Sequence, residues 1–104
     1  MSQRLEVLKE MVAQNPGDSF ARYGLAMEYA NAGKLEEAVA EYQVLLATNA
    51  DYPAAYFHGG QTLEKLNRLE EARELYRRGI EATVRMGDEH TRSELQTALD
   101  LLGE

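Results

Sequence analysis

Two histidines, His58 and His90, are the residues of this chain that first suggest metal chemistry. A zinc site needs further ligands at suitable spacing, and the chain has no cysteine to supply them. Asp88, Glu89 and His90 are adjacent in sequence, but neighbours along a helix point in different directions and do not chelate one ion easily. We therefore interpret His90 as a surface residue and His58 as a polar contact that could respond to pH, and we expect no metal and no cofactor.

Hydroxyl and carboxylate groups make no better case for catalysis. Ser19 and Ser93 are not accompanied by the histidine and acid pattern that activates a nucleophilic serine, and they suit helix ends or surface positions. The paired carboxylates Glu36 and Glu37 are expected at a helix start, where the helix dipole favours negative charge. Carboxylates this exposed are poor candidates for a general acid. We therefore expect that the chain is not an enzyme.

The composition fits one small globular domain over residues 1–104. With 44% hydrophobic and 28% charged residues, the chain has enough apolar side chains to bury a modest core and is not expected to be disordered. Its two prolines, Pro16 and Pro53, leave long stretches free to be helical. No apolar run approaches the length of a membrane span, and the N-terminus has no apolar signal core. We expect no membrane partner and a cytoplasmic location, and Met1 favours a complete unit.

The net charge of −7 argues against a nucleic acid as partner, because nucleic-acid-binding proteins usually present a basic surface. Arg73, Arg77 and Arg78 form a loose basic stripe, but glutamates are interleaved with it. We interpret this stripe as the solvated face of a helix, on which Glu74 is expected to pair with Arg78 one turn later.

An internal repeat organises the chain. The string Leu-Glu-Glu-Ala at residues 35–38 recurs at residues 69–72, a shift of 34 residues, and the same shift relates Tyr42 to Tyr76. Apolar residues in each copy recur at helical spacing and form two stripes, so each copy is predicted to be a pair of helices. The repeated units are residues 19–52 and residues 53–86.

Special residue types fall where such helix pairs need them. Gly33 and Asn67 each precede the repeated string, and these two residue types tolerate the left-handed conformation of a helix end. Pro53 can occupy a first helical turn, where its missing N–H costs little. Small side chains at recurring positions should let helix axes approach closely. These positions are Ala26, Ala38, Gly60, Ala72 and Gly79. Gly59 has no such explanation from the sequence.

The flanks are predicted to add one helix each. Residues 1–17 carry an apolar helix face followed by Pro16, and we interpret them as the second half of an incomplete repeat. Residues 88–103 begin at Asp88, a suitable N-cap, and carry a second apolar face. This last segment does not match the repeat, so we interpret it as an amphipathic helix that caps the array. The sequence therefore predicts an all-α fold of about six helices.

A period of 34 residues with two helices per unit resembles the tetratricopeptide repeat. The first unit supplies the matching residues Leu25, Ala26, Tyr29, Gly33, Ala38 and Tyr42. The second supplies Tyr56, Gly60, Leu63, Ala72, Tyr76 and Gly79. The chain departs from the family pattern at Arg22 and Gly59, and at Ala50 and Val84, where the closing proline is absent. The resemblance implies a right-handed superhelix of stacked helix pairs, an α-solenoid.

In this family the first helix of each pair lines a concave groove, and the resemblance implies which residues would face it. From the first unit they are Phe20, Tyr23, Gly24, Met27 and Asn31. From the second they are Ala54, Phe57, His58, Gln61 and Lys65. Arg92 is the one residue that fits the carboxylate clamp of some members, so we expect no such clamp. A glycine at position 24 would let another backbone come close to the groove.

Two functions remain open at this point. The groove residues are rich in aromatic side chains and include a methionine, residue types that carry binding energy at protein interfaces. The first hypothesis is an adaptor or scaffold that binds a peptide or helix of a partner protein. The alternative is a self-associating building block whose groove or helical ends mediate homo-oligomerisation. A separate interpretation of Phe20, Tyr23 and Met27 is that they only pack against neighbouring helices. The partner and the biological process do not follow from the sequence.

Overall fold

The computed structural model describes residues 3–103 and folds them into six α-helices. These are α1 (Gln3–Gln14), α2 (Ser19–Asn31), α3 (Leu35–Thr48), α4 (Pro53–Lys65), α5 (Leu69–Met86) and α6 (Glu89–Leu102). The predicted all-α fold with about six helices is confirmed. Within these described residues, no helix combines the length and the apolar character that crossing a membrane requires.

The ends of α2 and α4 are built in the same way from different residues. Gly33 (φ 80°) and Asn67 (φ 59°) both adopt the left-handed conformation that the sequence predicts. After each of them the next N–H donates back over the helix end, from Lys34 to the Tyr29 carbonyl and from Arg68 to the Leu63 carbonyl, both at 2.9 Å. These bonds satisfy carbonyls that a helix C-terminus leaves without partners and turn the chain sharply into the next helix.

The starts of α2 and α6 are capped by aspartates. The Asp18 carboxylate accepts a hydrogen bond from the Ala21 N–H, and the Asp88 carboxylate accepts one from the Thr91 N–H, both at 3.1 Å. Asp88 is therefore the N-cap that the sequence predicts. Pro53 lies in the first turn of α4, also as predicted.

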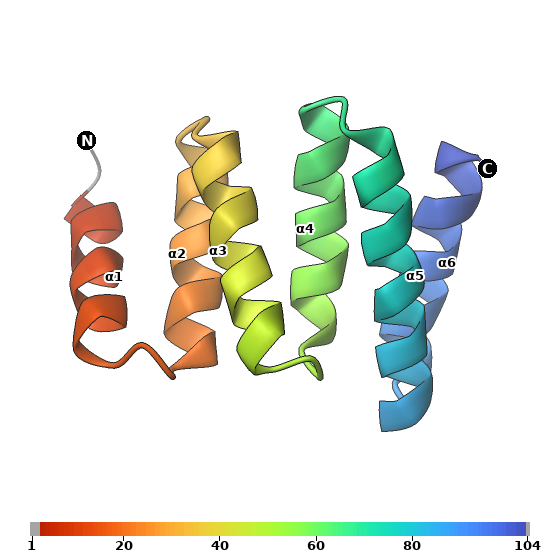
Figure 1. Cartoon of the computed structure of the whole chain (residues 1–104), viewed down its shortest axis with the longest axis horizontal. Coiled ribbons are helices and arrows are strands. Elements are labelled where there is room, and N and C mark those ends of the chain that lie inside the picture. Colours follow the sequence, from red (N-terminus) through yellow and green to blue (C-terminus); the bar gives the residue numbers. More distant parts are fainter. Residues whose placement is uncertain (1–2, 104) are drawn as a thin grey trace.

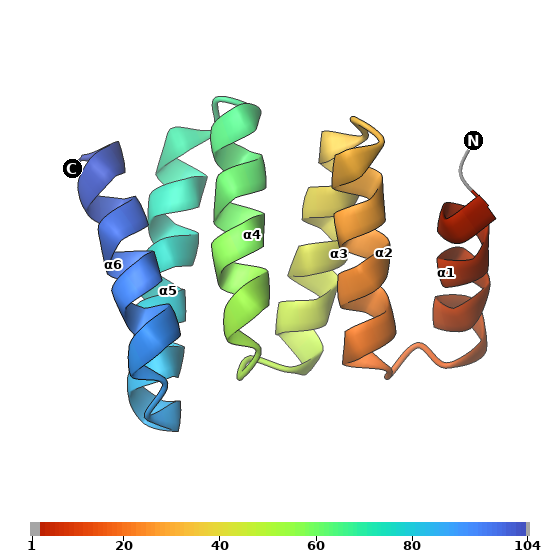
Figure 2. The ribbon, with the colours of Figure 1, turned by 180° about the vertical axis from the view of Figure 1, so that it is seen from behind.

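The helices stand side by side in a row and form two layers (Figures 1 and 2). Figure 2 shows α2, α4 and α6 on the face toward the viewer, with α3 and α5 behind them. Each helix packs on its neighbours in the chain, and α6 also touches α4. The last helix therefore continues the alternation of layers, although its sequence does not match the repeat. This arrangement places α2, α4 and α6 on one common face.

Small residues let the paired helices α4 and α5 approach closely. A Cβ added to Gly60 would lie 2.2 Å from the Tyr76 ring, and one added to Gly79 would lie 2.6 Å from the Tyr56 Cβ. Gly59 has the same role, since its Cβ would meet a Leu75 methyl at 2.9 Å. The predicted close approach is found at these positions, and the structure also explains Gly59, which the sequence does not.

The predicted pairing of Glu74 with Arg78 is wrong. Glu74 instead lies 3.9 Å from Arg77, one residue earlier. The Arg78 guanidinium lies over the ring of Tyr56, 5.7 Å from its centroid. The face of an aromatic ring attracts a cation, and Arg78 stands on the side of α5 that reaches α4.

Candidate partner-binding face

The first hollow on this face lies along α2, and we call it the α2 hollow. It has a volume of about 560 Å³. It is lined by Arg4, Phe20, Tyr23, Gly24, Met27, Glu28 and Asn31. The structure thus brings together all five residues that the resemblance assigns to the groove from the first repeat. Phe20 is 76% exposed, so this hollow leaves a large apolar residue open to solvent.

A group of rings fixes the floor of the α2 hollow. The Tyr23 ring lies 5.4 Å from that of Tyr52, 5.9 Å from that of His58 and 6.3 Å from that of Tyr42, measured between centroids. The buried Tyr42 hydroxyl donates to the Met27 sulfur at 3.1 Å. Burial raises the pKa of both Tyr23 and Tyr42, so these phenols stay neutral and act through apolar area and hydrogen bonds.

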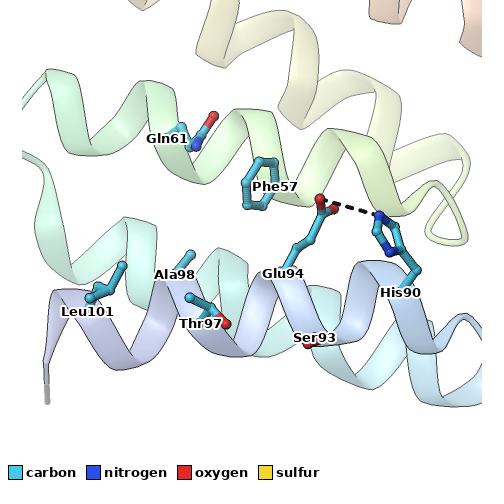
Figure 3. A pocket seen from close by; sticks show the side chains of 8 residues that line it. All are labelled: Phe57, Gln61, His90, Ser93, Glu94, Thr97, Ala98 and Leu101. Atoms are coloured by element: carbon cyan, nitrogen blue, oxygen red, sulfur yellow. Dashed lines mark ion pairs between the residues drawn. The ribbon is translucent and has the colours of Figure 1, made fainter.

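The second hollow lies between α4 and α6, and we call it the α4–α6 cleft (Figure 3). It has a volume of about 350 Å³. It is lined by Phe57 and Gln61 of α4 and by His90, Ser93, Glu94, Thr97, Ala98 and Leu101 of α6. The Leu101 side chain is 84% exposed. The His90 Nε2 lies 3.5 Å from the Glu94 carboxylate, and Figure 3 shows that carboxylate reaching from α6 toward α4 beside Phe57.

His58 lines neither hollow, but its ring contacts one aromatic residue of each. Its ring is in contact with Tyr23 of α2, and it stands edge-on to Phe57 of its own helix at 5.4 Å. Burial lowers the pKa of His58 below the ordinary histidine value of 6.5, and the nearby Glu94 carboxylate opposes that shift. Near neutral pH the imidazole is therefore an uncharged part of an aromatic row.

Besides His58, three predicted groove residues line neither hollow, which makes four in all. Ala54 lines a separate depression near Asp88, at the end of the molecule where α4 begins. Lys65 is exposed at the C-terminal end of α4. Arg92 is half-buried, and its guanidinium is held by Glu89 at 2.7 Å. Ala54, Lys65 and Arg92 therefore line neither of the two hollows, although Ala54 shares its depression with Tyr52 of the ring group.

The space beside Gly24, where a side chain would lie, is partly filled by α1. The expectation was that its missing side chain leaves room for the backbone of another molecule. A Cβ built on Gly24 would instead point at a Leu8 methyl of α1, 3.3 Å away. On this side of the residue α1 packs across α2 and occupies the space. Gly24 also lines the α2 hollow, and the approach of another backbone there stays a prediction.

Sequence reasoning missed most of the α6 residues that line the cleft. The resemblance transferred only Arg92, because α6 does not follow the repeat pattern. A signal was nevertheless present, since residues 90, 94, 97 and 101 recur at intervals of three and four and therefore share one helix face. Among the described residues, no group of three or more histidine, aspartate or glutamate side chains could hold a metal ion.

Comparison with known proteins identifies the class. A tetratricopeptide repeat family model matches residues 5–58, and a second model of the same description matches residues 53–83. The chain belongs to the tetratricopeptide repeat family, whose domains are in general protein–protein interaction modules, and no enzyme family is indicated. No curated protein matches the chain.

Solved structures place the chain beside small bacterial members. A tetratricopeptide repeat domain protein from Salinibacter ruber is 35% identical, with 86% of this chain and 90% of that chain covered and a TM-score of 0.81. A protein from Bordetella parapertussis is 27% identical, with 98% and 89% covered and a TM-score of 0.82. PcrH, solved in complex with the chaperone binding region of PopD, is 15% identical, with 94% and 74% covered and a TM-score of 0.88. This last likeness concerns the fold alone.

Proposed function

We propose that this chain is an adaptor module that binds a peptide or helix of a partner protein on the face formed by α2, α4 and α6. The observation that carries the proposal is the pair of hollows on this one face, each with a large apolar side chain left exposed. Phe20 stands in the α2 hollow and Leu101 in the α4–α6 cleft. Exposed apolar side chains grouped in hollows are typical of interaction surfaces.

The composition of the face supports a protein ligand. Its side chains include the aromatic rings of Phe20, Tyr23 and Phe57, Met27 and several polar and charged groups, which suits burial of a partner's apolar side chains with a few orienting polar contacts. Met27 and Tyr23 are positioned by the ring group described above, so binding would not have to order them first. PcrH, which shares the fold, was solved with a region of its partner PopD, and this neighbour supports peptide binding as a use of such a fold.

The test uses the two exposed side chains, because their truncation should leave folding intact. The chain and its Phe20→Ala/Leu101→Ala variant would each capture proteins from a lysate of the source cells, read by mass spectrometry. The matched control is Val44→Ala/Val84→Ala, which truncates exposed apolar side chains of α3 and α5 in the other layer. A protein retained by wild type and control but lost by the first variant supports the proposal. Equal capture by all three chains contradicts it.

Self-association remains a second candidate because of α1. This helix packs on α2 alone among the described helices, and Val7 and Met11 on it are 57% and 44% exposed. A second copy that covered these side chains would bury them without using the face of α2, α4 and α6. Sedimentation at increasing concentration tests this candidate, since it requires a dimer that Val7→Asp/Met11→Asp dissociates. A monomer at all concentrations would exclude it.

A further inference from the structure

The carboxylates around the proposed binding face differ in how their charge is balanced. Glu28 in the α2 hollow pairs with Arg4 at 3.2 Å, and Glu89 at the start of α6 pairs with Arg92 at 2.7 Å. Among the residues that the structure describes, Glu94 in the α4–α6 cleft forms an ion pair with His90 only, at the longer distance of 3.5 Å. An arginine is always charged, whereas a histidine is commonly neutral at physiological pH.

The rest of the α4–α6 cleft does not supply the missing positive charge. Its eight lining residues include one carboxylate, Glu94, and no lysine or arginine. His58, the nearby titratable group on α4, is kept neutral by its burial among rings. Phe57 lies beside the Glu94 carboxylate, and Ala98 and Leu101 continue the apolar part of the cleft along α6.

We propose that the α4–α6 cleft receives a partner segment in which an apolar side chain lies next to a lysine or arginine. The apolar side chain would cover Phe57, Ala98 and Leu101, and the cation would pair with Glu94. This inference rests on the proposed function and adds the chemistry of the ligand to it.

Two physical arguments favour a partner segment with a basic residue over a purely apolar segment or an acidic one. A purely apolar segment that closed the cleft would remove water from the Glu94 carboxylate without supplying a full opposite charge, which is costly. An acidic segment would meet the same carboxylate and a chain whose net charge is −7. A basic segment is attracted by that net charge, and its cation supplies a full opposite charge to the Glu94 carboxylate.

The test selects ligands without assuming a partner. A random peptide library displayed on phage would be panned on the full wild-type chain and on Glu94→Lys. Glu94 has a half-exposed side chain, so the folded state should tolerate this change, which circular dichroism checks. Wild type should enrich peptides with an apolar residue beside a lysine or arginine, and Glu94→Lys should exchange that basic preference for an acidic one. A synthetic peptide from the wild-type selection should bind Glu94→Gln roughly tenfold more weakly.

The outcomes distinguish failure of the charge pairing from failure of the proposed binding function. Enriched peptides that need Phe20 and Leu101 but show no basic preference, or keep it on Glu94→Lys, overturn the charge pairing and leave the proposed binding face standing. Failure of wild type to enrich any peptide overturns both. A basic preference that reverses on Glu94→Lys and is lost with Leu101→Ala supports the inference.

Discussion

Replacing Gly60 with alanine tests the packing that brings α4 and α5 together beneath the proposed face. The new Cβ would lie 2.2 Å from Cε1 of the Tyr76 ring, more than 1 Å short of the 3.4 Å at which ordinary contact begins. That ring has little room to move away. Tyr76 is fully buried, and its hydroxyl donates a hydrogen bond to the Glu64 carboxylate.

The magnitude follows from two opposing terms. Overpacking a core costs about 1–3 kcal/mol, and so short a contact with a buried ring belongs at the upper end. Alanine gains about 1 kcal/mol over glycine inside a helix. The net expectation is that Gly60→Ala lowers the free energy of unfolding by about 2 kcal/mol, which lowers the Tm of a domain of this size by roughly 10 °C.

Chemical denaturation followed by circular dichroism measures this difference. Gly24→Ala is the matched control, since its Cβ would meet only a Leu8 methyl at 3.3 Å, so the helix gain should leave stability equal or slightly higher. If Gly60→Ala were as stable as wild type, the close packing of α4 on Tyr76 would not be a constraint.

Three further predictions concern single side chains. Asn67→Ala should lower the free energy of unfolding in urea by about 1 kcal/mol, because the φ angle of 59° disfavours alanine. Asn67→Gly should change it by no more than about 0.5 kcal/mol, since glycine tolerates this conformation. Equal losses in the two variants would contradict the left-handed assignment. Asp88→Ala should cost about 1 kcal/mol and increase hydrogen exchange in α6 first, and unchanged exchange there would count against its capping role. Because burial lowers the pKa of His58 in the folded state, the unfolded chain takes up its proton first, so stability should fall as pH drops below 6.5 and level off once folded His58 is also protonated. His58→Gln should reduce the loss between about pH 7.5 and about pH 5.5, and an identical pH dependence would refute the effect.

The sequence predicts local features of this fold better than it predicts contacts between helices. Gly33, Asn67 and Asp88 were identified correctly because the conformation of a helix end depends on a few neighbouring residues. The family resemblance also identified five of the seven residues that line the α2 hollow, because these five occur within one matching unit. The division of the chain into a half-repeat, two repeats and a terminal helix stays a prediction, as does the binding role of the assigned groove residues.

What the sequence could not supply depends on how separate helices meet. Glu94 and Leu101 line the α4–α6 cleft only because α6 takes a place beside α4, and the repeat pattern does not extend to that helix. Gly24 faces α1 because the N-terminal helix crosses α2 there. Arg78 contacts an aromatic ring of another helix instead of a glutamate one turn away. Each of these depends on distances that spacing along the chain does not encode.

The central claim is that a partner binds on the face of α2, α4 and α6. Nuclear magnetic resonance of the isotope-labelled chain, titrated with the captured partner, tests it most directly. The account predicts that amide signals shift around Phe20, Tyr23, Phe57 and Leu101, while signals from the exposed side of α3 and α5 stay in place. Shifts confined to α3 and α5, or to the outer side of α1 around Val7, would contradict it.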